Sequence, residues 1–189
     1  MTDKAAVTTY VALVRGINVG ASTLVPMADF ARLLHDAGFT EVKTLLRSGN
    51  AVFDAPAPLG DGGAAEIEKR FADVTGVSAR FVLLEASDFL GIVRQNPLVG
   101  IADDLSKLMI TFLPGQTPDP AGIEFPDADD LLPEVISVGS RAVYAWCPLG
   151  VSSSAIPAKF WRQFGPAATT RNANTVNKLV SLVLPRLEG

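Results

Sequence analysis

Two glycine-containing segments in the first third of the chain carry the residue types best suited to holding an anion. They are Arg15-Gly-Ile-Asn-Val-Gly20 and Arg47-Ser-Gly-Asn50. Arginine offers a planar fork of N–H donors that matches phosphate or carboxylate, and glycine-containing turns can present backbone N–H groups to an anion. The same glycines and asparagines also suit plain turns, so a structural role stays open. With Arg47 as a further donor, the predicted ligand contacts are Arg15, Gly16, Asn18, Gly20, Ser48, Gly49 and Asn50.

A second polar segment, Thr169-Thr-Arg-Asn-Ala-Asn-Thr175, lies near the C-terminus and precedes apolar residues at helical spacing. We expect it to open the last helix, where backbone N–H groups and the positive end of the helix dipole favour an anion. Some of the same residues could serve only as helix caps, and both interpretations stay open. The predicted contacts here are Thr170, Arg171, Asn172 and Asn174.

Other site chemistry has little support in the sequence. One histidine, His35, and one cysteine, Cys147, cannot make a Cys/His zinc site. The HExxH, CxxC, GxGxxG, phosphate-loop and GxSxG patterns are absent. We expect Cys147 to be a small buried hydrophobe, and the Ser152–Ser154 run to cap a helix. The sequence therefore predicts no cofactor and no metal, and it leaves open whether the protein is an enzyme.

Composition sets the class of protein. The chain has 189 residues, and 16 basic against 20 acidic residues give a net charge of −4. Hydrophobic residues make up 48%, enough for a core, which excludes bulk disorder. No run approaches the ~18 apolar residues of a membrane span, and the N-terminus lacks a signal-peptide pattern. Because one cysteine cannot form an internal disulfide, we expect a cytoplasmic protein with no membrane partner.

The first half of the chain predicts the elements that position the first two segments. Its hydrophobic pattern gives the order βαββαβ, the ferredoxin-like unit, with an antiparallel sheet of spatial order 4-1-3-2. Strand 1 then lies between strands 3 and 4, so its end lies beside their starts. Three segments are thereby predicted at one end of the sheet, which we call the rim: Arg15–Gly20, Arg47–Asn50 and Arg80.

The second half predicts an imperfect echo of the first. A strand at 107–113, a hairpin over 135–146 and a helix around 156–164 give βαββα, and an extra helix follows at the C-terminus. The fold class is therefore α+β with two small subdomains, 1–96 and 97–189. The apolar face of the last helix suggests that it returns to the first half. In that case the 169–174 segment and the rim would share an inter-subdomain cleft.

Three motifs resemble a bacterial family catalogued as "domain of unknown function 1697". The resemblance covers almost the whole chain, and it implies two α+β subdomains in a small cytosolic protein without implying a reaction. The sequence departs from the family pattern at Ala21–Leu24, at Ala155 and at Ala173, where cations or an aromatic residue are common. The residues that carry the resemblance are Val11–Gly20 with Val25–Met27, Ser48–Phe53, and Thr169–Asn172 with Asn174–Val176 and Lys178-Leu179.

Three functions follow as alternatives. The first is a protein that binds a small anionic ligand, with or without catalysis. The second is a protein-interaction or dimerisation module, suggested by the apolar composition and the edges of two small sheets; the oligomeric state stays open. The third is a nucleic-acid-binding module of the RRM type, with Tyr10 and Phe53 as stacking platforms. A net charge of −4 disfavours nucleic acid as a partner.

Overall fold

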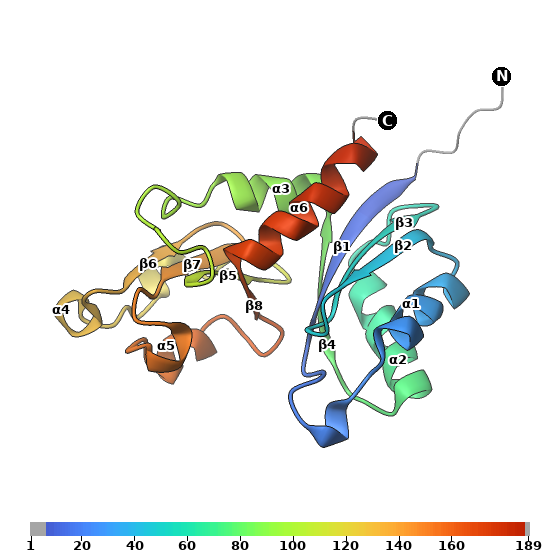
Figure 1. Cartoon of the computed structure of the whole chain (residues 1–189), viewed down its shortest axis with the longest axis horizontal. Coiled ribbons are helices and arrows are strands. Elements are labelled where there is room, and N and C mark those ends of the chain that lie inside the picture. Colours follow the sequence, from blue (N-terminus) through green and yellow to red (C-terminus); the bar gives the residue numbers. More distant parts are fainter. Residues whose placement is uncertain (1–6, 188–189) are drawn as a thin grey trace. The chain divides into compact units, whose positions relative to one another are not determined.

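A computed structural model describes residues 7–187, and these residues form two compact units (Figure 1). The first unit comprises the described residues up to Phe89 together with those from Leu179 onward, and the second is Leu90–Lys178. Each unit is built around a four-stranded antiparallel sheet. The predicted α+β class with two subdomains and a C-terminal helix is confirmed.

The first unit has the predicted element order. Its sheet runs β2-β3-β1-β4, so β1 lies between β3 and β4 as expected. Helices α1 and α2 lie on one face of this sheet (Figure 1). The bounds are β1 Thr8–Arg15, α1 Met27–Asp36, β2 Thr40–Leu45, β3 Asn50–Ala55, α2 Gly63–Thr75 and β4 Arg80–Glu85.

Local sequence explains where the two helices begin and end. Pro26 precedes α1, where its fixed φ suits a helix start. Gly76 ends α2 with φ of 70°, the left-handed conformation that glycine adopts without strain. The faces turned to the sheet meet in an aromatic cluster, in which Phe30 contacts Phe71 and Phe81 edge-to-face at centroid distances of 5.7 and 5.8 Å. Such pairs add about 0.5–1.5 kcal/mol each beyond the area they bury.

The C-terminal part of the last helix belongs to the first unit. Helix α6 spans Ala173–Leu187, and its residues from Leu179 group with the first unit. There Arg186 Nη1 lies 3.2 Å from Asp54 Oδ1 on β3, and Nη2 donates to the Glu41 carbonyl oxygen at 2.7 Å. The expectation that this helix returns to the first half is confirmed.

The second unit repeats the topology of the first. Its sheet runs β6-β7-β5-β8, the same order as β2-β3-β1-β4 when its strands are numbered within the unit. Its main helices are shorter than α1 and α2. The bounds are β5 Leu108–Phe112, α4 Ala128–Leu131, β6 Val135–Val138, β7 Ala142–Trp146, α5 Ala158–Arg162 and β8 Thr169–Asn172.

Strand β8 corrects the interpretation of the second polar segment. Thr169–Asn172 does not belong to a helix start; it pairs antiparallel with β5, with Ile110 opposite Arg171 and Thr111 opposite Thr170. The alternation of buried and exposed residues is that of a strand, but its buried positions hold Thr169 and Arg171 instead of apolar residues. The capping prediction holds for Asn172, whose Oδ1 accepts from Thr175 N at 2.9 Å.

Two helices connect the units in the same way along the chain. Helix α3, Ala86–Arg94, begins directly after β4, and α6 begins directly after β8. Each helix starts in the unit of the strand before it and ends in the other unit. In the second unit, the Tyr144 hydroxyl on β7 donates to the Ile92 carbonyl oxygen of α3 at 2.7 Å. Over residues 7–187, no helix is long and apolar enough to cross a membrane.

Candidate functional site

The rim forms as the strand order requires. Leu13 of β1 lies opposite Asn50 of β3, and Arg15 lies opposite Arg80 of β4. The Val14 N–H donates to the Gly49 carbonyl oxygen at 2.8 Å, which joins the end of β1 to the turn before β3. The prediction that these segments share one end of the sheet is confirmed.

The side chain of Asn18 fixes the loop that follows β1. It has φ of 55°, a left-handed conformation that asparagine tolerates better than most residues. Its Nδ2 donates to the carbonyl oxygens of Arg47 at 2.7 Å and Val25 at 3.1 Å. Its Oδ1 accepts from Val25 N at 2.9 Å. These contacts use both amide protons, so a ligand could meet only the remaining lone pair of Oδ1.

The second rim turn is equally determined by its residues. Gly49 has φ of +78°, and a Cβ there would lie 2.6 Å from Ile17 Cδ1 and 2.8 Å from Val14 Cβ. Glycine is therefore required both by conformation and by space. Asn50 is fully buried, and its Nδ2 donates to the Leu45 carbonyl oxygen at 2.8 Å and to Ser48 Oγ at 3.0 Å.

The arginines of the rim differ in their surroundings. Arg15 and Arg47 are exposed. Arg80 pairs with Glu68 of α2, with Nη1 and Oε2 2.9 Å apart. Gly16 has φ of +93°, a backbone conformation that favours glycine. Gly20 has φ of −174°, an extended conformation that any residue can adopt. The rim therefore presents two exposed arginines, Arg15 at the end of β1 and Arg47 in the turn before β3.

The predicted contacts in the second unit lie on and after β8. Arg171 is buried, and its Nη1 donates to Thr169 Oγ1 at 3.0 Å and to the Thr170 carbonyl oxygen at 2.8 Å. Burial lowers the pKa of its guanidinium to about 10. The Thr170 hydroxyl lies 2.8 Å from that of Thr111, and Asn174 is exposed on α6.

A polar cluster beside Cys147 was not predicted. Cys147 is buried, as expected. Burial raises the pKa of its thiol, and the nearby Glu134 carboxylate raises it further, while a hydrogen bond with Ser154 acts in the opposite sense. Ser154 Oγ donates to Glu134 Oε2 at 2.9 Å. The capping prediction for Ser152–Ser154 is wrong, because α5 begins after Pro157 without a side-chain cap. A raised pKa keeps this thiol protonated and unreactive.

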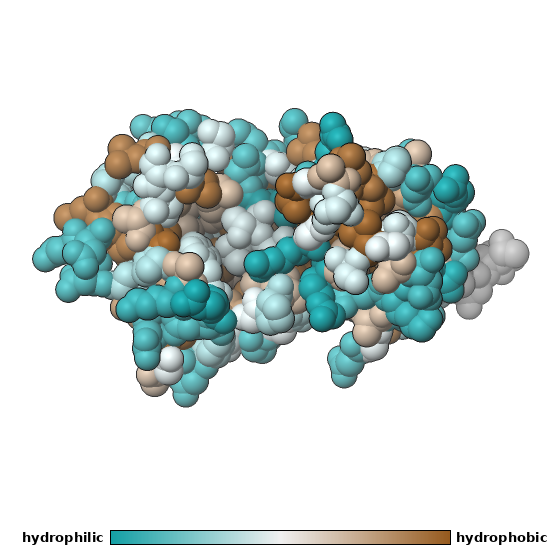
Figure 2. All heavy atoms as spheres, turned by 90° about the horizontal axis from the view of Figure 1, so that it is seen from below, coloured by the Kyte–Doolittle hydropathy of each residue, from teal (hydrophilic) through white to brown (hydrophobic). Residues whose placement is uncertain are grey.

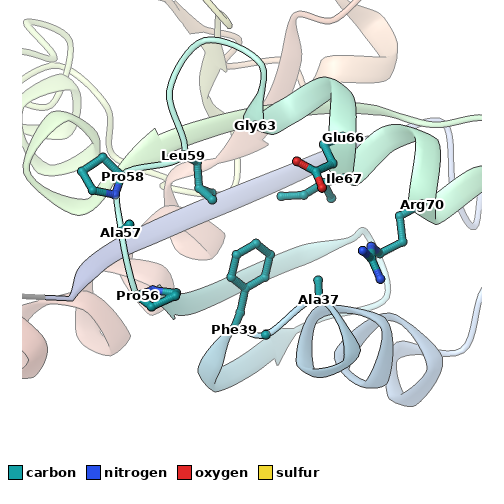
Figure 3. A pocket seen from close by; sticks show the side chains of 11 residues that line it. Ala37, Phe39, Pro56, Ala57, Pro58, Leu59, Gly63, Glu66, Ile67 and Arg70 are labelled. Carbon is teal, nitrogen blue, oxygen red and sulfur yellow. The ribbon is translucent and has the colours of Figure 1, made fainter. Parts of the chain in front are cut away.

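The sequence also gave no sign of a pocket at the other end of the first unit's sheet (Figure 3). Its volume is about 370 Å³. It lies between the turn after α1, the loop after β3 and the first turns of α2, three segments that are distant in sequence. The lining residues are Ala37, Gly38, Phe39, Pro56, Ala57, Pro58, Leu59, Gly63, Glu66, Ile67 and Arg70.

Three stacked rings support the pocket from inside the unit. Phe39 stacks on Phe53 at a centroid distance of 4.5 Å, and Phe53 stacks on Tyr10 at 6.0 Å. Tyr10 is 5% exposed and Phe53 is fully buried, so neither ring can serve as a stacking platform for bases. The Tyr10 hydroxyl accepts a hydrogen bond from Leu59 N at 3.0 Å, and burial raises the pKa of this hydroxyl.

Among the described residues, no group of three or more histidine, cysteine, aspartate or glutamate side chains could hold a metal ion. In the first unit, the rim and the pocket at the opposite end of the same sheet are two places with potential binding chemistry.

Comparison with known proteins identifies relatives but no activity. Residues 7–144 match the family described as Protein of unknown function (DUF1697). No curated protein matches the chain. Among solved structures, the chain is similar to the conserved bacterial protein SP0830 from Streptococcus pneumoniae, with 25% sequence identity and a TM-score of 0.69. This similarity covers 94% of the present chain and 99% of that one.

Proposed function

Because the chain belongs to the DUF1697 family, whose description assigns no activity, we propose from its own residues that it binds a small molecule carrying a phosphate or carboxylate at the rim. The observation that carries this proposal is the hydrogen bond that joins the loop after β1 to the turn before β3. Asn18 of that loop donates to the carbonyl oxygen of Arg47, so Arg15 at the end of β1 and Arg47 stand on one fixed support.

Charge distribution supports the proposal. The chain as a whole is acidic, with a net charge of −4, yet three arginines gather at one end of the first sheet. Arg80 forms an ion pair with Glu68, whereas Arg15 and Arg47 are exposed and can meet an anion from solvent. Two guanidinium forks can each form paired hydrogen bonds to one phosphate or carboxylate.

Rigidity of the rim supports it too. The loops are held by Asn18 and by the buried Asn50, and Gly49 has no room for a side chain beside Ile17. A ligand that meets a preformed support loses less free energy to ordering the protein. Within this proposal, the asparagines position the loops, and the arginines carry the charge that recognises the ligand.

The test is a thermal-shift screen of nucleotides, sugar phosphates and small dicarboxylates against the wild type, Arg15→Ala and Arg47→Ala. A ligand at 100 times its Kd stabilises a protein by about 2.7 kcal/mol, so a hit should be clear. We expect the hit to be lost in both rim variants. Arg32→Ala is the matched control, because it removes an exposed arginine of α1 that pairs with its neighbour Asp29. No shift with any compound, or an equal loss in Arg32→Ala, would overturn the proposal.

A second candidate function is protein interaction, and a different observation favours it. Large apolar side chains of the second unit are exposed, including Leu132 at 72%, Leu149 at 66% and Phe125 at 53%. Figure 2 shows apolar residues reaching the surface in several patches. Exposed apolar patches are typical of interaction surfaces. Light scattering across a hundredfold concentration range tests self-association: a constant monomer mass would argue against a dimer.

A further inference from the structure

The pocket in the first unit has the size and lining of a small-molecule site. Its volume of about 370 Å³ lies within the range of about 300–1,000 Å³ found for ligand pockets. It lies away from the rim, because β3 begins at Asn50 beside the rim and ends at Ala55, next to the Pro56–Leu59 loop. A ligand here would therefore be independent of the anion proposed for the rim.

The walls of the pocket are held in place by contacts within the unit. The Tyr10 hydroxyl accepts from Leu59 N at 3.0 Å, which anchors the loop. Gly63 gives Leu59 its room, since a Cβ at that position would lie 2.6 Å from Leu59 Cβ. On the other side, Phe39 is fixed by its stacking on Phe53. The pocket is thus preformed, which lowers the cost of binding.

Two opposite charges stand at one end of this pocket. Figure 3 shows the Glu66 carboxylate and the Arg70 guanidinium at the end of the pocket away from Pro56 and Pro58. Both residues are on α2, one helical turn apart, a spacing at which glutamate and arginine commonly pair. Within residues 7–187, however, no ion pair joins them.

Another pair on α2 with the same spacing of four residues does form an ion pair. Lys69 and Asp73, also four residues apart, form an ion pair with Nζ and Oδ2 2.7 Å apart. Glu66 and Arg70 instead each face the pocket as a separate charge. Separate unlike charges beside an apolar cavity are complementary to a ligand that carries both an ammonium and a carboxylate on an apolar body.

We propose that this pocket binds a small zwitterion of the α-amino-acid class with an aromatic or branched aliphatic side chain. The ammonium of the ligand bonds the Glu66 carboxylate, and its carboxylate bonds the Arg70 guanidinium through paired N–H donors. The side chain of the ligand packs against Phe39, Leu59 and Ile67. Recognition therefore depends on both charges at once.

The test is calorimetric titration of the full chain with L-phenylalanine and two analogues. N-acetyl-L-phenylalanine lacks the ammonium, and phenethylamine lacks the carboxylate. We expect L-phenylalanine to bind most tightly. Glu66→Gln should weaken the binding of L-phenylalanine by roughly tenfold and leave the binding of the N-acetyl analogue unchanged. Arg70→Gln should also weaken L-phenylalanine binding by roughly tenfold, and it should leave the binding of phenethylamine unchanged. Each variant loses the charge-assisted interaction with one of the two charged groups of the ligand.

Two control variants isolate the pocket. Lys69→Gln removes an exposed charge from the same helix outside the pocket lining, and Arg15→Ala removes a cation of the rim. Both should leave the affinity for L-phenylalanine unchanged, and circular dichroism should show every variant folded. The proposal fails if the wild type shows no saturable binding of L-phenylalanine or L-leucine up to millimolar concentrations. It also fails if neither Glu66→Gln nor Arg70→Gln changes the affinity for L-phenylalanine. Loss of binding in Arg15→Ala would likewise overturn it, because that result would assign the amino acid to the rim.

Discussion

The side-chain amide of Asn18 donates a hydrogen bond of 2.7 Å to the carbonyl oxygen of Arg47, and so joins two loops 29 residues apart in the chain. The same side chain makes two further bonds to the backbone of Val25. One residue therefore closes the loop after β1 and fixes the turn before β3. Asn18, which the sequence predicts as a ligand contact, thus also fixes the loops that carry the rim.

Replacing Asn18 with glycine should lower the free energy of unfolding by about 2–3 kcal/mol, because three hydrogen bonds are lost. The positive φ at this position adds no cost, since glycine adopts it without strain. Asn18→Ala should cost about 1 kcal/mol more, since alanine is strained at positive φ. Urea denaturation of both variants measures these differences. A loss below about 0.5 kcal/mol in Asn18→Gly would mean that the three bonds do not stabilise the fold.

Gly49→Ala should destabilise the protein by about 2–4 kcal/mol, because it adds a close contact with Ile17 and Val14 to the strain of positive φ. Gly60→Ala is the matched control: its φ is +60°, but nothing lies within 4 Å of the added Cβ. It should cost only about 1 kcal/mol. Thermal unfolding of the two variants separates the steric contribution from the conformational one, and equal losses would contradict the crowding argued for Gly49.

The neighbourhood at the rim could be predicted because antiparallel order alone determines it. Once the first unit is recognised as βαββαβ, the end of β1 must lie beside the starts of β3 and β4. Which residues of the rim meet a ligand could not be predicted in the same way. The hydrogen bonds of Asn18 depend on a loop conformation that turn propensities do not specify.

Strand β8 was missed because its buried positions carry polar residues. A half-buried strand is recognised by alternating apolar residues, but here Thr169 and Arg171 occupy the inner face. Threonine and asparagine before an apolar stretch also favour a helix start, and that signal was correct only for Asn172. The pocket was missed for a different reason: Phe39, Leu59 and Arg70 come from three separate segments.

Arg186→Ala should destabilise the first unit by about 1–3 kcal/mol, because it leaves the half-buried Asp54 without its cation and the Glu41 carbonyl oxygen without a donor. Arg32→Ala removes a similar ion pair whose arginine is 66% exposed, and it should change stability by less than about 0.5 kcal/mol. Native-state hydrogen exchange should show faster exchange in β3 for Arg186→Ala. Unchanged protection of β3 would mean that Arg186 does not hold α6 on this unit.

Tyr144→Phe should lower stability by about 1 kcal/mol at neutral pH, because the Ile92 carbonyl oxygen loses its donor. The same change should alter the response to alkali. Burial raises the pKa of the Tyr144 hydroxyl from 10.0 to about 12 in the folded protein. Above pH 10 the unfolded chain therefore loses a proton that the native state keeps, and this contribution to stability, fully present below pH 10, is lost progressively as the pH rises towards 12.

The cost of Tyr144→Phe should accordingly be largest below pH 10 and shrink above it. Urea denaturation of wild type and variant at pH 8, 9, 10 and 11 measures the difference directly. Other alkaline groups, such as Arg171 with its pKa of about 10, are present in both proteins and cancel in the comparison. A difference between wild type and variant that stays constant from pH 8 to pH 11 would show that the folded state does not protect this hydroxyl from ionisation.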